Sequence, residues 1–237
     1  MIWKNNSLSI VLFLITVVLI GAMFLTGWQV YDRELAEHGR LAIGAADYLT
    51  SGHFLSTMFE NWESEFLEKA AYVVFTAFLI QRGSAESRDP DEPQDQDNDA
   101  PGSNPASPWP VRSGKLVRWL YSYSLGIVLV LIFVGTILLH LTSSREKANM
   151  EAELHGQPQV GYWEHLGEAE FWFESFQKWQ SEFMSTGALV VLSIFLRFRG
   201  SPESKSVSAP HSETGKETES RNRNRAIVTA VACSALL

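Results

Sequence analysis

The chain has 237 residues, a formal net charge of −8 and a single cysteine, Cys233. One cysteine excludes an intrachain disulfide and a thiolate metal cluster. The acidic residues are spread over connecting segments and no basic face is visible, so we expect no nucleic-acid partner. Length alone fits one or two soluble domains, but the distribution of apolar residues excludes that organisation.

Two long apolar stretches dominate the chain. Residues 8–28 carry no charge, and residues 124–141 carry only His140, at the end. At about 1.5 Å per residue, about twenty such residues cross the roughly 30 Å of bilayer hydrocarbon. We therefore expect membrane spans at 8–27 and 124–142. The first is longer than a signal-peptide core and no clear small-residue cleavage site follows it, so we interpret it as a retained anchor.

Two shorter apolar stretches, 67–81 and 184–198, each hold only about eleven consecutive uncharged residues. Alone, each would indicate a buried helix or a re-entrant segment. Basic side chains can reach the headgroups at their ends, Lys69 and Arg82 in the first case and Arg197 and Arg199 in the second. We expect both to span, which gives four spans.

The charged residues alternate between the segments that join the spans. Loop 82–118 and the tail from 197 carry basic residues, whereas loops 28–66 and 143–183 are dominated by glutamate and aspartate. The positive-inside rule then predicts that both termini and the central loop lie in the cytoplasm.

Residues 7–87 and 124–204 align at a constant shift of 117 positions without a gap, and about 30 of the 81 pairs are identical. The repeat predicts an architecture: two copies of one membrane hairpin, 1–82 and 115–200. Because each copy crosses twice, the copies share an orientation and a pseudo-two-fold axis along the membrane normal. The predicted fold is all-α and integral to the membrane, with four transmembrane helices as two parallel-repeat hairpins.

Two polar segments complete the chain. Residues 83–114 are acidic and Pro-rich, and residues 201–237 are mostly polar. Neither buries enough apolar surface to offset its ordering entropy, so we expect a disordered cytoplasmic linker and a mostly disordered tail. The apolar end, 226–237, is too short to span; both an inner-leaflet segment and a disordered one fit it.

Each outer loop ends in an amphipathic helix that runs into the short span. The apolar stripes are Leu55, Met58, Phe59, Trp62 and Phe66 in the first copy, and Trp172, Phe176, Trp179 and Phe183 in the second. The polar side chains opposite the first stripe are Glu60, Asn61, Glu63 and Ser64. This helical spacing and aromatic content suit the outer membrane interface.

Glu34 and His38, repeated as Glu151 and His155, put a carboxylate and an imidazole one helical turn apart, and Gly follows each histidine. The ordinary explanation is a helix C-cap with the histidine near the helix dipole. The alternative is a Glu2His2 metal site across the pseudo-dyad.

A second repeated set, Trp62 with Glu65 and Trp179 with Glu182, lies where the short spans enter the membrane. We name these four residues the collar. One hypothesis is that the two carboxylates face each other as a cation or proton site. The other is that they lie at the interface beside tryptophan anchors. Because no charge lies in the middle of any span, pumps and ion-coupled transporters are disfavoured.

The motif Arg82-Gly-Ser-x-Glu-Ser recurs as Arg199-Gly-Ser-x-Glu-Ser. Arginine followed by glycine is the ordinary end of a helix, and a cytoplasmic docking site is the alternative.

The segments Gly52-His53-Phe54 and Phe59-Glu-Asn-Trp-Glu-Ser-Glu-Phe-Leu67, closed by Arg82–Ser87, resemble a family of small bacterial multi-pass membrane proteins defined only as a domain of unknown function. The resemblance covers roughly 1–90 and 115–204. The second copy departs from the motif at Glu168–Phe171 and Lys178–Gln180. The resemblance implies four spans and brings no catalytic residue, cofactor or substrate.

No phosphate-binding loop, nucleophile elbow or dinucleotide fingerprint is visible, so we expect no enzyme, no catalytic residue and no cofactor. The leading hypothesis is a non-enzymatic interaction or envelope-associated module whose collar binds another membrane or envelope protein, a lipid surface or a cation. The alternative is a small channel or transporter with its pathway on the pseudo-two-fold axis.

Overall fold

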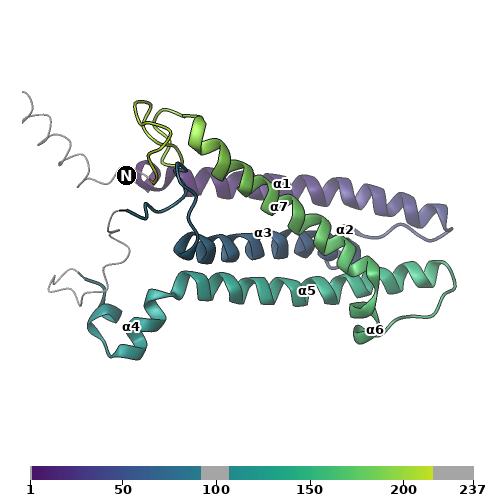
Figure 1. The fold of residues 1–237 in the computed structure, drawn as a ribbon. Helices are drawn as coiled ribbons and strands as arrows, with labels where there is room; N and C mark the ends of the chain where they lie inside the picture. The colour runs from purple at the N-terminus through teal and green to yellow at the C-terminus, as the bar shows by residue number, and fades with distance from the viewer. Residues whose placement is uncertain (1, 92–106, 216–237) are drawn as a thin grey trace, which may run out of the picture. The chain divides into compact units, whose positions relative to one another are not determined.

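The computed structural model describes residues 2–91 and 107–215, and every regular element within them is a helix. Figure 1 shows them in chain order. They are α1 (Ile2–Glu37), α2 (Ala45–Leu49), α3 (Gly52–Phe78), η2 (Trp109–Arg112), α4 (Lys115–Ser122), α5 (Ser124–Leu154), α6 (Tyr162–Gly167) and α7 (Ala169–Phe195). The predicted all-α class is confirmed for this part of the chain, while the expectations for 92–106 and 216–237 lie outside it.

Two of the described helices are long and apolar enough to cross a membrane. They are α1 from Trp3 to Glu37, and α5, with mean hydropathies of 2.9 and 2.6 over their most apolar windows. Each is longer than the roughly 20 residues that the hydrocarbon requires. Their last turns are therefore polar helix that continues beyond the apolar stretch. Helices α3 and α7 do not meet the same criterion.

Helices α3 and α7 end at Phe78 and Phe195, three residues before the predicted span ends. A turn takes the place of the last residues of the predicted span 67–81. The Gln81 N–H donates to the Ser87 Oγ at 2.9 Å, and Gly83 has a φ of +84°, which favours glycine. The same hydrogen bond and left-handed glycine recur 117 residues later, at Phe198, Ser204 and Gly200. The repeated Arg-Gly-Ser motif therefore forms a turn that begins four residues after the last helical residue, and its glycine does not itself end the helix.

The chain folds into two compact units, each made of two separate stretches of sequence. The first comprises Met1–Phe66 and Leu131–Lys178, and the second comprises Leu67–Val130 and Trp179–Leu237. The apolar core of the first unit consists of buried Tyr31, Leu35, Tyr48 and Phe54, against which further side chains of α1, α3 and α5 pack. Its aromatic rings contact edge to face or tilted, as aromatic pairs prefer.

In the second unit, the described part of the tail, residues 201–215, makes hydrogen bonds with the turn that follows α3. Lys205 is buried, and its ammonium lies among backbone carbonyl oxygens of Gly83, Pro210, His211 and Glu213. The Gly215 N–H also donates to the Ser84 carbonyl at 2.9 Å. The sequence predicts disorder from the low apolar content of the tail. These contacts of residues 201–215 are hydrogen bonds, most of which the buried Lys205 ammonium donates.

The bounds of the elements recur at the shift of 117. Helices α1 and α5 end at residues 37 and 154, α2 and α6 begin at 45 and 162, and α3 and α7 cover 52–78 and 169–195. The loops after α1 and α5 are tied back in the same way. The Ile43 N–H donates to Asp32 Oδ1 at 2.9 Å, and the Val160 N–H donates to Asn149 Oδ1 at 2.7 Å.

Helix α4 lies before the second long apolar stretch, in a region where the sequence pattern does not predict a helix. It is eight residues long, and Leu116, Trp119 and Leu120 are exposed on it. Its basic residues are Lys115 and Arg118, and the Arg118 Nε donates to the Val111 carbonyl of η2.

Candidate functional site

A buried polar cluster in the first unit joins α3, α5 and α7. His140 and Glu63 have fully buried side chains, and the His140 Nδ1 lies 3.1 Å from Glu63 Oε2. The other carboxylate oxygen, Oε1, accepts a hydrogen bond from the Ser175 hydroxyl at 2.8 Å. Glu63 thus contacts the imidazole through one carboxylate oxygen and the Ser175 hydroxyl through the other, and the two contacts hold the His140 ring in this orientation.

Two more carboxylates, of Glu60 and Glu174, lie close to the His140 ring. Its Nε2 is buried without a hydrogen-bond partner and lies 3.9 Å from Glu174 Oε2. One ligand atom each from Glu60, His140 and Glu174 lie within 4.8 Å of one another. The Lys147 ammonium holds the other oxygen of Glu174 at 3.2 Å. These three residues, Glu60, His140 and Glu174, are the Glu–His–Glu cluster below.

The two carboxylates of the cluster have opposite electrostatic environments. The neighbouring imidazole of His140, helped by Lys147, lowers the pKa of Glu174 although burial opposes this. Burial raises the pKa of Glu60, and Lys178 offsets only part of that rise. Of the two carboxylates in the cluster, Glu60 is therefore the one whose negative charge the surrounding side chains compensate less.

Part of the polar face of α3 lies inward. Glu63 and Ser64 are buried, whereas Trp62 on the predicted apolar stripe is exposed. On α7, Ser175 is buried and Phe176 is exposed. On both helices, a polar side chain is thus buried next to an exposed aromatic one. The Glu63 carboxylate can be buried because an imidazole and a hydroxyl on neighbouring helices pair with it.

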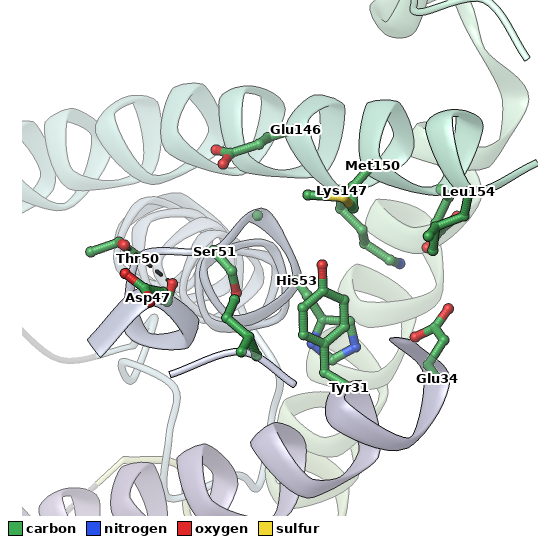
Figure 2. Close-up of a pocket in the computed structure, with 13 residues that line it drawn as sticks. Tyr31, Glu34, Asp47, Thr50, Ser51, His53, Glu146, Lys147, Met150 and Leu154 are labelled. Atoms are coloured by element: carbon green, nitrogen blue, oxygen red, sulfur yellow. Dashed lines mark hydrogen bonds between the residues drawn. The ribbon is translucent and has the colours of Figure 1, made fainter. Parts of the chain in front are cut away.

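A cavity of about 180 Å³ lies elsewhere in the first unit, between α1, α2, α3 and α5. Figure 2 shows Lys147 on one side and Tyr31 and Glu34 on the other, with the His53 ring next to that of Tyr31. Further carboxylates on its wall belong to Asp47, Glu146 and Glu151. Side chains of both charges line it, which suits a small polar molecule.

His53 is the imidazole of this cavity. Its ring stacks on Tyr31 at a centroid distance of 4.8 Å, and its Nδ1 shares a hydrogen bond of 3.1 Å with the Tyr48 hydroxyl. Burial lowers the pKa of His53, Lys147 lowers it further, and Glu34 offsets part of the effect. The ring is therefore held in its neutral form over a wider pH range than a free histidine.

The sequence-predicted metal candidates divide between two places. Glu34 and Glu151 line the cavity, whereas His38 and His155 are exposed with their ring centroids 5.2 Å apart. Each Nδ1 donates to a carbonyl oxygen one turn earlier, at 2.9 and 2.8 Å. The metal hypothesis for these four residues stays a prediction.

The predicted helix caps at the same positions are confirmed. Gly39 and Gly156 have φ values of +69° and +66°. The Arg40 N–H donates to the Leu35 carbonyl, and the Gln157 N–H donates to the Ala152 carbonyl. These are the hydrogen bonds of a helix that ends in a left-handed glycine.

The collar residues belong to different units, Trp62 and Glu65 to the first, Trp179 and Glu182 to the second. Glu65 is exposed on α3, and Trp179 and Glu182 are half-buried on α7. The predicted cation or proton site at the collar therefore stays a prediction.

Sequence reasoning missed the Glu–His–Glu cluster because it favoured residues that both copies retain. At the shift of 117, His140 corresponds to Met23, and Glu63 to Gln180. One feature of the sequence could have identified the cluster: His140 is the only ionisable residue of the apolar stretch 124–141.

Comparison with known proteins places the chain in a family. No curated protein and no solved structure matches it. Residues 1–216 match the family DUF6766, described as a domain of unknown function. Because that match covers most of the chain, the protein belongs to the DUF6766 family.

Proposed function

We propose that this chain is a four-span protein of the bacterial inner membrane, built from two hairpins, and that it acts as a non-enzymatic interaction module. In this proposal the outer, acidic part of the protein, formed by the first unit's polar helix ends, binds another membrane or envelope protein. Trp62 and Glu65 of the collar, together with the cavity wall, are the surfaces of the first unit available for that role.

One observation carries the proposal: the described helices bury polar side chains and expose apolar ones. Glu63, His140 and Ser175 are buried, while Phe13 and Leu131 are exposed. A soluble helical protein has the opposite distribution. In lipid, ionisable and polar residues lie toward the interior of a helix bundle, and apolar side chains contact the hydrocarbon.

Three further observations support the four-span arrangement. The helix bounds and loop contacts recur at the shift of 117, as two copies of one hairpin require. Helices α1 and α5 have the length and hydropathy of spans. Helix α4 combines exposed Leu116 and Trp119 with basic Lys115, a composition suited to the inner interface.

Cysteine accessibility tests the topology. In a Cys233→Ser background, single cysteines at Ala42, Gln157, Ser113 and Ser208 are treated in intact cells with a membrane-impermeant maleimide. Four spans predict labelling of the first two from outside and of the last two only after permeabilisation. If α3 and α7 do not cross, position 113 is labelled from outside and position 157 is not, which contradicts the proposal.

Purification in mild detergent tests the interaction role. Mass spectrometry of the wild type should identify one stoichiometric protein companion, and a variant with Trp62→Ala and Glu65→Gln should lose it. Glu170→Gln, an exposed substitution on α7, should keep the companion. A wild type that purifies alone would leave the binding role without support.

The channel alternative also has an observation in its favour. Thr136, His140, Ser143 and Ser144 form a buried polar stripe at helical spacing along α5. Polar residues near the end of an apolar helix often line an ion or proton path.

A further inference from the structure

The Glu–His–Glu cluster has the composition of a divalent metal site. One imidazole nitrogen and two carboxylate oxygens come from three helices, with Glu60 on α3, His140 on α5 and Glu174 on α7. Imidazole and carboxylate together suit Zn²⁺, Fe²⁺ and Mn²⁺, and three protein ligands leave a coordination position open.

The orientation of His140 points to a ligand rather than to a structural ion pair alone. Its ring is fully buried, Nδ1 is held by Glu63, and Nε2 has no hydrogen-bond partner and lies 3.9 Å from Glu174 Oε2. A histidine that binds a metal almost always donates its other N–H to a carboxylate or a carbonyl, which fixes the ring and makes the free nitrogen more basic. Glu63 has that role here, and Ser175 in turn orients Glu63.

The three ligand atoms lie within a slightly wider range of one another than the ligand atoms around a bound metal ion, so the side chains would move a short way inward on binding. Ligand atoms about 2.1 Å from one metal lie within about 4.2 Å of one another, and the three atoms here lie within 4.8 Å. The two glutamates are only partly buried, so their side chains have room to move toward Nε2. The ion would also compensate the negative charge of Glu60, which surrounding cations balance least.

We propose that Glu60, His140 and Glu174 bind one divalent first-row transition metal, and that Glu63 positions the imidazole. The proposal goes beyond the interaction role and does not depend on the number of spans. The proposed metal ligands are not the repeated histidines His38 and His155, which are the candidates that the sequence predicts.

The test uses the full chain in detergent, stripped with a chelator and then given Zn²⁺ alone. Elemental analysis and competition with a metal indicator should give one Zn²⁺ per chain. Glu60→Gln and Glu174→Gln should weaken binding at least tenfold, and His140→Gln should abolish it. Glu63→Gln should cost roughly 10–100-fold in affinity, as loss of an orienting partner does. X-ray absorption should report one nitrogen and two oxygen ligands from the protein.

His165→Gln is the matched control. His165 is also buried, but its Nε2 pairs with the Ser144 hydroxyl at 2.9 Å and its Nδ1 with Glu168 at 2.7 Å. This variant should keep its Zn²⁺ even if its thermal stability falls. Thermal unfolding of each variant separates loss of a ligand from loss of the fold.

Three outcomes would overturn the proposal. The first is a wild type that retains no Zn²⁺, which leaves the cluster as a buried ion-paired network. The second is a His140→Gln variant with unchanged affinity. The third is loss of Zn²⁺ in His38→Ala, His155→Ala with the cluster variants unaffected, which assigns the metal to the exposed histidines.

Discussion

The Tyr48 hydroxyl lies directly against Gly27, in the space that a side chain at that position would occupy. Tyr48 belongs to α2 and is fully buried in the core of the first unit. The glycine therefore lets the short helix pack onto α1. At the shift of 117 the corresponding residues, Ser144 and His165, are also in contact, through a hydrogen bond of 2.9 Å.

Gly27→Ala should destabilise the protein by about 1–3 kcal/mol, the usual cost of forcing an extra methyl group into a packed core. Thermal unfolding in detergent measures the effect. Gly21→Ala on the same helix is the control, because nothing lies within 4 Å of its added Cβ. That variant should be neutral or slightly stabilising, since alanine is the better helix former.

A double variant identifies the cause. Tyr48→Phe removes the hydroxyl that the new methyl group would meet, so that Gly27→Ala should cost less in its presence than in the wild type. Equal costs in the two backgrounds would mean that the Gly27–Tyr48 contact does not limit the packing.

Gly52 explains part of the family motif at the start of α3. A Cβ there would approach the Lys147 nitrogen at 2.6 Å and the Ser143 carbonyl oxygen at 2.8 Å, both of the α5 backbone. Backbone cannot move aside as a flexible side chain can, so Gly52→Ala should destabilise the protein by about 2 kcal/mol or more. Gly187→Ala in α7, with nothing within 4 Å of its Cβ, is the control. A similar loss of stability in both variants would contradict this account.

The sequence predicts what depends on local pattern. The helical class, the two long apolar helices, the glycine caps at Gly39 and Gly156 and the glycine turns at Gly83 and Gly200 all follow from residue type and spacing. Each of these features is decided within a few residues of the chain.

What the sequence does not predict depends on partners that are distant along the chain. Glu63 occupies the polar side of an amphipathic pattern, and it is buried because His140, 77 residues later, and Ser175, 112 residues later, pair with it. Likewise, the Lys205 ammonium donates a hydrogen bond to a carbonyl 122 residues earlier, at Gly83. Composition and periodicity carry no information on such pairings.

His53 should make the stability of the protein depend on pH. Its folded-state pKa lies below its unfolded value of about 6.5. Between these two values the unfolded chain binds a proton that the folded protein does not, so the free energy of unfolding falls as the pH is lowered through this window. Below the folded-state pKa the loss levels off, and above about pH 6.5 the full stability is present.

The charged and titratable groups that face His53 are Tyr31 and Glu34 of α1, Tyr48 of α2 and Lys147 of α5. Thermal unfolding from about pH 7.5 to about pH 5 measures the effect, with His53→Gln as the comparison. The variant should have a flatter profile over this range, while His38→Gln, which removes an exposed histidine, should retain the wild-type slope. Identical profiles for the wild type and His53→Gln would contradict the assignment.

Glu65 and Glu182 distinguish a channel from a binding module. If a cation pathway passes the collar, liposomes with the wild type should show K⁺ or proton flux, and the double variant Glu65→Gln, Glu182→Gln should reduce it to the protein-free level. Its stability should change by only about 0.5 kcal/mol, because substitutions away from a packed core have small effects. Glu170→Gln is the control, because it removes an exposed carboxylate from α7, the helix that carries Glu182. Flux that is undetectable, or that survives the double substitution, eliminates the channel, whereas flux lost only in that variant would argue against a module that merely binds a partner.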